Sequence, residues 1–178
     1  MKKSIAFILI IASFVVCACT LKNEGQYDTQ FDEGSNQTIS FNGVTMSIPF
    51  EWKESNATKS DDERCFEELD NSKAEYSPLN LLYLTVYNEI ESLTDGMDSI
   101  ECLFPESEGY EITSREDLII DGCESKNLTV QKKGKDGDVF FKQTLIEKEK
   151  HLVLISFTCK NEYALYDYDK VIDSIVVE

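Results

Sequence analysis

"VFFKQTLIEKEKHLVLISFTC", residues 139–159, contains two apolar runs that flank the charged turn 148–150. The second run is apolar at both alternating sets of positions. One set is Leu152 and Leu154, and the other is Val153, Ile155 and Phe157. Alternate residues of a strand point to opposite faces, and a sheet that is wet on one side would alternate apolar with polar residues. We therefore expect a central hairpin in a sheet that helices or long loops cover on both faces.

A second hairpin is expected near the start of the folded region, in "ISFNGVTMSIPFEWKE" (residues 39–54). Asn42-Gly43 is typical of a two-residue type I′ turn between alternating strands. Such a turn pairs Phe41 with Val44 and Ile39 with Met46, and Ile48 continues the same face. We expect Pro49 to end the strand and Trp52 to be a core anchor rather than a ligand platform.

Further strands and a loop are indicated between these hairpins. "LNLLYLTVY" (residues 79–87) is typical of a strand buried on both faces, and strand patterns flank Asp121-Gly122. "KKGKDGD" (residues 132–138) separates two strand patterns and is expected to be a loop. Its Asp136 and Asp138 fall short of the oxygen ligands that a calcium loop needs, so a hairpin turn is the expected role.

Helices are predicted over three segments. The first, "SDDERCFEEL" (residues 60–69), has Ser60 as a candidate N-cap and acidic residues in its first turn. The second, "TDGMDSIECLF" (residues 94–104), would be capped by Thr94 and stopped by Pro105. Its apolar residues at helical spacing form the expected inner stripe: Met97, Ile100 and Phe104.

The third predicted helix closes the chain over residues 161–178, with Asn161 as a candidate cap. Its apolar residues recur at helical spacing. They are Leu165, Tyr168, Ile172 and Ile175. Its acidic residues are expected on the solvated face. They are Asp167, Asp169 and Asp173. Tyr163 and Tyr166 either form a recognition surface or pack on the sheet.

The chain begins with a segment that resembles a bacterial lipoprotein signal peptide. Lys2 and Lys3 precede an apolar run from Ile5 to Ala18, which is shorter than the ~20 residues of a membrane-spanning helix. The run ends in "VCAC", which is similar to a lipobox. The resemblance implies cleavage after Ala18 and a diacylglyceryl group on Cys19, with Cys17 standing where the family prefers Ser, Ala or Thr. The alternatives are an ordinary secreted protein and an uncleaved anchor.

The expected organisation is therefore a signal peptide (residues 1–18), a lipidated cysteine with a polar tether (19–38) and one globular domain (39–178). The chain has 17 basic and 34 acidic residues, a formal charge of −17, and loss of Lys2 and Lys3 brings the mature charge to −19. Such a surface argues against nucleic-acid binding and against docking on anionic lipid. It is compatible with solubility at a crowded surface, or with attraction of cationic ligands or Ca²⁺.

Cysteines and histidine offer little chemistry. Cys65, Cys102, Cys123 and Cys159 would remain in the mature chain, without a CxxC pair. The predicted hairpins separate Cys123 from Cys159 by roughly 23 Å along a strand, so these two should not form a disulfide. A Cys65–Cys102 bond stays open. His151 is the one histidine, and it has no evident nucleophile or orienting partner. We predict no catalytic residue, no metal site and no cofactor.

The order of elements resembles the PsbP-like family. The resemblance rests on "FNGVTMSIPFEWKE", "IIDGCESKNLTV", and "HLVLISFTC" followed by "YDKVIDSIVV". It implies an α+β fold, with a largely antiparallel twisted sheet covered by helices on both faces as an α/β/α sandwich. The family shares no catalytic residues, and many of its bacterial members look like lipid-anchored proteins.

These observations lead us to expect a non-catalytic binding or accessory domain. It would be held by its lipid on the outer side of a bacterial cytoplasmic membrane, with a protein or envelope component as partner and no nucleic acid. The alternatives are an envelope hydrolase that uses a carboxylate pair, and a lipoprotein that binds a small ligand or cation. A cleft with two convergent carboxylates would favour the hydrolase. An exposed apolar or aromatic patch would favour a protein partner.

Overall fold

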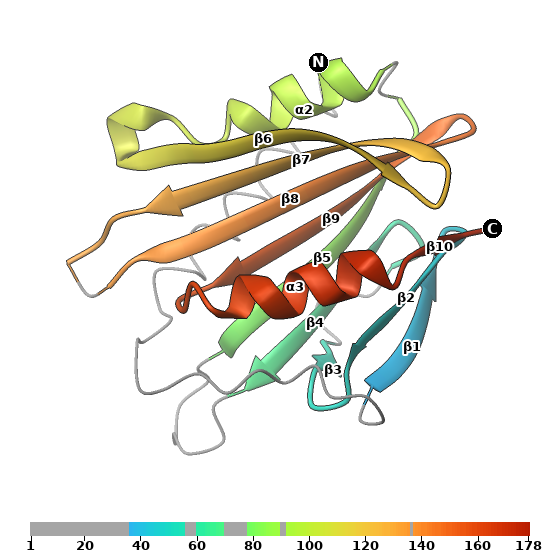
Figure 1. Ribbon diagram of the computed structural model, residues 1–178, viewed down its shortest axis with the longest axis horizontal. Coiled ribbons are helices and arrows are strands. Elements are labelled where there is room, and N and C mark those ends of the chain that lie inside the picture. Colours follow the sequence, from blue (N-terminus) through green and yellow to red (C-terminus); the bar gives the residue numbers. More distant parts are fainter. Residues whose placement is uncertain (1–35, 56–59, 70–77, 90–91, 136) are drawn as a thin grey trace.

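A computed structural model describes residues 36–55, 60–69, 78–89, 92–135 and 137–178 (Figure 1). These residues form a three-stranded sheet, β1-β2-β10, and a seven-stranded sheet, β3-β4-β5-β9-β8-β7-β6, in which neighbouring strands are antiparallel. The strands are β1 (Asn36–Phe41), β2 (Val44–Pro49), β3 (Lys53–Glu54), β4 (Glu63–Leu69), β5 (Pro78–Tyr87), β6 (Tyr110–Ile120), β7 (Cys123–Lys132), β8 (Val139–Lys148), β9 (His151–Cys159) and β10 (Val176–Val177). The helices are α2 (Leu93–Glu101), the 3₁₀ helix η1 (Glu106–Glu108) and α3 (Ala164–Asp173).

The first hairpin has the predicted register. Phe41 pairs with Val44 and Ile39 with Met46. Asn42 and Gly43 have φ angles of 47° and 73°, the left-handed conformation that a type I′ turn requires. The inward residues of the hairpin, including Ile48, are all buried. Asn36 begins β1, slightly ahead of the predicted start of the domain at Ile39.

The central strands are also as predicted. β9 lies between β5 and β8, and Lys148 pairs with His151 across their turn. Val153, Ile155 and Phe157 belong to one apolar cluster with the first hairpin and α3, whereas Leu152 and Leu154 belong to another with α2. Trp52 is fully buried and stacks on Phe157 with ring centroids 5.5 Å apart. Trp52 is therefore the core anchor that the sequence predicts.

Alternate residues of β9 belong to two apolar clusters, one of which includes residues of α3 and the other residues of α2. The α+β class with a dominant antiparallel sheet is therefore confirmed, and the narrower α/β/α sandwich stays a prediction. The stripe Met97, Ile100 and Phe104 is buried as expected. Within the described ranges, no helix combines the length and apolarity that crossing a bilayer requires.

Two helix predictions are wrong: the helix expected over residues 60–69 and the N-cap expected for α2. Residues 63–69 of the first predicted helix form β4, which pairs along β5. The charged sequence suits a helix locally, but a strand here buries Phe66 in the main cluster and Cys65 beside Leu81. The cap of α2 is Ser92, not Thr94, and the Ser92 hydroxyl accepts a hydrogen bond from the Asp95 amide at 3.1 Å.

The closing helix is shorter than predicted and rotated. α3 ends at Asp173, and Val176 and Val177 instead pair with β2 as β10. Tyr168 and Ile175 are buried as expected, while Leu165 and Ile172 are half-buried. Asp167 is fully buried, so its assignment to the solvated face is wrong. The helix buries positions 164, 167, 168 and 171, a stripe one position away from the predicted one.

The cysteines follow the strand register. Cys123 pairs with Ile120 at one end of β7, whereas Cys159 lies opposite Phe140, which lies opposite Gln131 near the other end. Cys123 and Cys159 are free thiols, as that register requires. Cys65 is buried and Cys102 is exposed, and they too are free.

Candidate functional site

The sequence-predicted lipidation site, Cys19, and the cleavage site after Ala18 lie outside the described residues. Asp136 lies outside them as well. Its neighbour Asp138 accepts hydrogen bonds from the Gln131 side chain at 2.7 Å and from the Gly134 amide at 3.4 Å. Asp138 therefore stabilises the β7–β8 loop, which agrees with the predicted turn.

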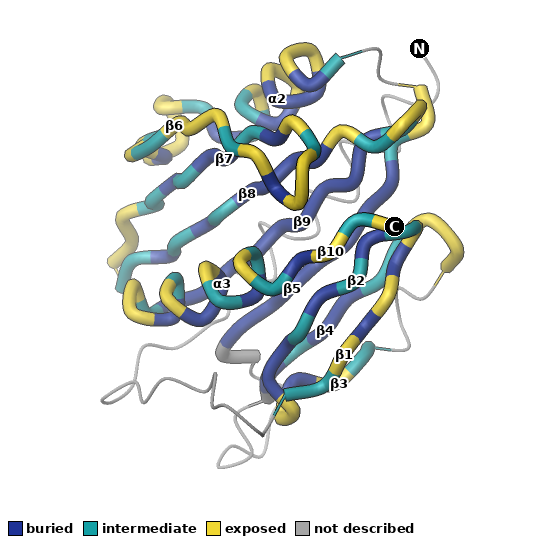
Figure 2. Tube along the Cα trace, turned by 45° about the vertical axis from the view of Figure 1, so that its right-hand side comes forward, coloured by how far each residue is buried: buried dark blue, intermediate teal, exposed yellow. Residues whose placement is uncertain are grey.

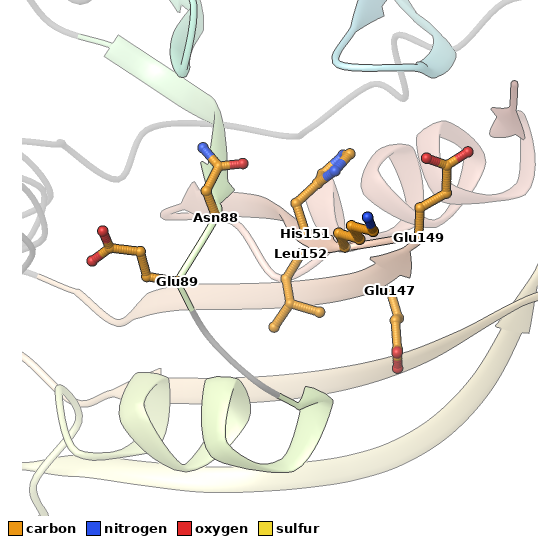
Figure 3. Close-up of a pocket in the computed structure, with 7 residues that line it drawn as sticks. Asn88, Glu89, Glu147, Glu149, His151 and Leu152 are labelled. Carbon is orange, nitrogen blue, oxygen red and sulfur yellow. The ribbon is translucent and has the colours of Figure 1, made fainter.

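His151 lines an open cavity of about 420 Å³ at the β8–β9 turn (Figure 3). Its other lining residues are Asn88, Glu89, Glu147, Glu149, Lys150 and Leu152. Figure 3 shows the carboxylates of Glu89, Glu147 and Glu149 pointing in different directions, so they do not form the convergent pair that glycoside hydrolysis needs. The buried Nε2 atom of His151 has no hydrogen-bond partner among the described residues. Among the described residues, His151 therefore lacks the hydrogen-bond partner that would orient it as a general base.

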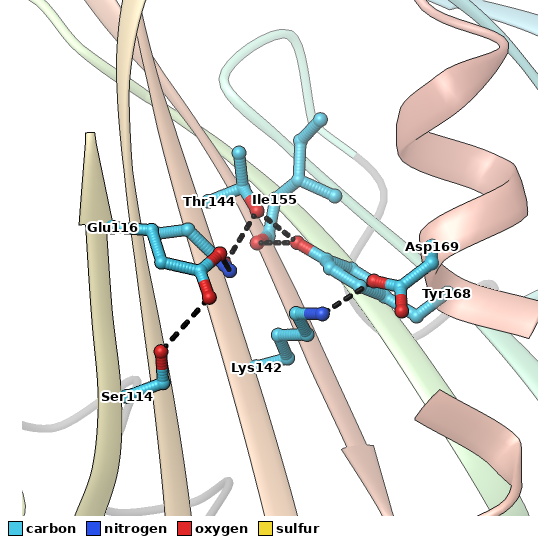
Figure 4. A network of polar contacts seen from close by, with 8 residues as sticks. Ser114, Glu116, Lys142, Thr144, Ile155, Tyr168 and Asp169 are labelled. Carbon is cyan, nitrogen blue, oxygen red and sulfur yellow. Dashed lines mark hydrogen bonds and ion pairs between the residues drawn. The ribbon is translucent and has the colours of Figure 1, made fainter. Parts of the chain in front are cut away.

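α3 is positioned by a polar network that the sequence analysis did not identify (Figure 4). The Tyr168 hydroxyl lies 2.7 Å from Thr144 Oγ1 and 2.9 Å from the Ile155 carbonyl oxygen. Thr144 Oγ1 in turn donates to Asn127 Oδ1 at 3.1 Å. Burial raises the pKa of Tyr168. This hydroxyl therefore stays protonated and serves as a fixed donor that holds α3 to the sheet.

The network continues to the outer strand. Asn127 donates to Glu116 Oε2 at 3.3 Å, and Ser114 donates to Glu116 Oε1 at 3.0 Å. Lys142 on β8 forms an ion pair with Asp169 on α3. The strand register brings the centre of the network together. Asn127, Thr144 and Ile155 are far apart in sequence but are direct neighbours across β7, β8 and β9. The sequence signal that could have indicated this network is the presence of isolated polar residues at inward positions of apolar strands.

The opposite side of α3 carries the predicted tyrosines. Tyr163 is 74% exposed and Tyr166 is 52% exposed, so they form a surface and do not pack on the sheet. Figure 2 shows exposed and buried residues alternating along α3. The aromatic surface thus stands on a helix that the Tyr168 network fixes in place. Tyr and Trp are the residue types that most often dominate protein interfaces.

Other cavities lie between α2 and the β6–β7 hairpin. Two of about 410 and 450 Å³ share Thr94, Asp117 and Lys126 in their linings. The basic side chains that line these cavities already form ion pairs within the chain. Lys126 pairs with Asp117 at 2.7 Å, and Arg115 pairs with Glu101 at 2.8 Å. In the part of the chain that the structure describes, no group of His, Cys, Asp and Glu side chains is arranged to hold a metal ion.

Comparison with known proteins relates the chain to solved structures at low identity. Cyanobacterial PsbP (CyanoP) from Synechocystis has 15% identity and a TM-score of 0.59, and the match covers 86% of this chain and 98% of CyanoP. The Ran-binding protein Mog1p from Saccharomyces cerevisiae has 12% identity and a TM-score of 0.59, with 80% and 95% of the chains covered. LpqN from Mycobacterium tuberculosis, described as involved in cell envelope biogenesis, has 10% identity and a TM-score of 0.53, with 85% and 99% covered.

These likenesses show a shared fold. No curated protein matches the sequence significantly. The sequence profile of the family described as "PsbP-like protein" matches residues 4–178. This protein therefore belongs to the PsbP-like family.

Proposed function

We propose that this protein is a lipid-anchored, extracytoplasmic, non-catalytic binding domain whose partner is a protein. The observation that carries the proposal is the pair of exposed tyrosines, Tyr163 and Tyr166, on a helix fixed to the sheet by buried hydrogen bonds. Such a surface suits a protein partner, because it is preorganised and exposes large aromatic area. The Ran-binding neighbour Mog1p gives a precedent for protein binding on this fold.

The anchor proposal rests on the N-terminal sequence. Lipid on Cys19 and a polar tether would hold an α/β/α sandwich near the outer side of the cytoplasmic membrane of a bacterium. A mature chain of net charge −19 would not adhere to anionic head groups by itself, so the lipid supplies the attachment. Two or three acyl chains give stable anchoring, whereas one chain gives only marginal binding.

Intact mass of the membrane-extracted protein tests the anchor. We expect an acylated chain that begins at Cys19, and Cys19→Ala should release the protein or leave an unprocessed precursor. Cys17→Ala is the matched control, and it should be processed normally because alanine suits that lipobox position. An unmodified mature chain that begins at another residue would show that the anchor is wrong.

Photocrosslinking on intact cells tests the binding role. A photoreactive phenylalanine analogue at Tyr166 should trap one reproducible protein, while the same analogue at Ile119, 70% exposed on the β6–β7 hairpin, should not. A parallel screen of envelope polysaccharide and peptide substrates tests the hydrolase alternative. Reproducible turnover that disappears when one carboxylate, such as Glu147, is changed to glutamine would overturn the proposal.

A further inference from the structure

Exposed aromatic rings of this chain differ in whether a lysine covers them. The Lys53 ammonium lies 4.2 Å from the centroid of the Phe50 ring, and that of Lys170 lies 5.1 Å from the Tyr166 ring. Tyr163, the most exposed of the large apolar side chains described, has no ring or cation contact with any described residue. The face of an aromatic ring attracts cations, so Tyr163 is an open site for one.

Carboxylates at the two ends of this helix face are also available. Glu162 and Asp173 are exposed and have no side-chain hydrogen bond or ion pair with the described residues. Asp169 is already paired with Lys142, and Lys170 lies over Tyr166. Tyr163, Tyr166, Lys170 and Asp173 follow helical spacing and share one face of α3. The exposed face therefore has unpaired negative charge at both ends.

The positive end of the helix dipole lies near Tyr163 and disfavours a cation there. Glu162 precedes the helix, so its carboxylate opposes that partial charge. A helix terminus contributes about half an elementary charge. The balance at Tyr163 thus remains favourable to a cation.

From this arrangement we infer that the α3 stripe, defined as Glu162, Tyr163, Tyr166, Lys170 and Asp173, docks a protein segment that carries arginine or lysine. One cation seats on the Tyr163 ring beside Glu162, and a second lies opposite Asp173. The two ends of the stripe are about 15 Å apart along the helix. An extended segment spans that distance in about five residue steps, which leaves four residues between its two cations.

This inference rests on the proposed protein-binding function and adds the chemistry of the partner. The chain has 34 acidic against 17 basic residues, which steers basic partners toward it and repels a second copy of the chain. The same charge disfavours an anionic bilayer on this face. A basic protein segment is therefore the occupant that the stripe favours.

A peptide titration of the mature chain in neutral detergent micelles tests the inference. The probe is the acetylated and amidated peptide Ala-Arg-Ala-Ala-Ala-Ala-Arg-Ala, and its citrulline counterpart has the same shape without charge. Backbone amide NMR shifts locate binding and give the affinity. We expect arginine-dependent shifts at the α3 stripe that weaken at about 0.3 M salt, where the Debye length is well under 10 Å.

Substitutions on the two kinds of ring sharpen the test. Tyr163→Ala should weaken binding about two- to fivefold, the range expected of an exposed cation–π contact, while Tyr163→Phe keeps the ring and should bind as the wild type does. Phe50→Ala is the matched control, because Phe50 is 58% exposed but already covered by Lys53, and it should not alter binding.

Three results would overturn the inference: equal binding of the citrulline peptide, unchanged affinity of Tyr163→Ala, or shifts spread evenly over the acidic surface. A partner trapped by crosslinking at position 166 alongside any of these results would leave the binding function standing and refute only the basic segment. Failure of both experiments would refute the proposed function as well.

Discussion

α2 and α3 are similar in length and belong to different apolar clusters, yet their sequences serve different purposes. α2 begins at a Ser92 cap, buries an apolar stripe and is tied to β6 by the Arg115–Glu101 ion pair. α3 lacks a side-chain hydrogen bond from its N-cap residue, Tyr163, and buries Asp167 and Tyr168 while it exposes two tyrosines. Packing and capping account for the sequence of α2. The exposed tyrosines of α3 are explained by neither, and it is on them that we place the proposed binding function.

Thiol labelling provides the widest contrast between the two helices. Cys102 caps the end of α2 and is exposed, whereas Cys159 precedes α3, is fully buried and lies 3.3 Å from the Asn161 carbonyl oxygen. Burial raises the pKa of the Cys159 thiol, which removes the reactive thiolate. In native protein near pH 8, we expect Cys159 to react at least ~1000-fold more slowly than Cys102, because labelling requires local opening.

Peptide mapping by mass spectrometry at successive times measures both rates. In denaturant the two cysteines should react alike, which serves as the control for reagent access. Comparable native rates would show that the junction between β9 and α3 opens readily, and would remove the rigidity on which the comparison depends.

The strands and turns of this fold could be predicted because their signals are local. Asn42-Gly43 sets the first turn, and the apolar residues of β9 on both faces identify its central place. β4 could not be predicted in this way, because its charged sequence favours a helix and only pairing with β5 makes it a strand. β10 likewise exists through its two pairs with β2.

The candidate site was predictable only on its exposed side. Tyr163 and Tyr166 are visible in the sequence as aromatic residues beside acidic ones. The Tyr168–Thr144–Asn127 contacts depend on the register of strands that are separated in sequence. The rotation of α3 that buries Asp167 is a packing result, since the apolar pattern alone allowed a neighbouring stripe.

Truncation of the buried anchor of each helix tests whether α3 is held more firmly. Tyr168→Ala should lower the free energy of unfolding by about 4 kcal/mol, because it leaves a large cavity and removes the hydroxyl contacts. Ile100→Ala in α2 should lower it by about 3 kcal/mol. Urea denaturation followed by Trp52 fluorescence measures both. A larger loss for Ile100→Ala would reverse the ranking.

The N-cap residues of the two helices should respond differently to alanine. Ser92→Ala removes the cap to the Asp95 amide and should lower the free energy of unfolding by about 1 kcal/mol. Tyr163→Ala should change it by less than about 0.5 kcal/mol, because the ring is 74% exposed. The same denaturation curves decide this. A loss at Tyr163 as large as that at Ser92 would mean that Tyr163 has a structural role, which would weaken its use in the binding test.

Acid titration of the α2–β6 ion pair has the smallest expected effect, because both side chains reach water. Hydrogen bonds from Arg115 lower the pKa of Glu101 from its ordinary 4.5. A carboxyl with a lowered pKa stabilises the fold above its ordinary pKa, and that contribution is lost as the pH falls through the lowered value. Glu101→Gln should therefore have a lower melting temperature than the wild type near neutral pH, and the difference should shrink below pH 4.5.

Asp98→Asn is the control, because it removes one charge from the same helix without breaking an ion pair. Its difference in melting temperature from the wild type should not shrink in that way. If the Glu101→Gln difference persists unchanged to pH 3, the side chain contributes by packing, and the contrast with the buried contacts of α3 would have to rest on Ser92 alone.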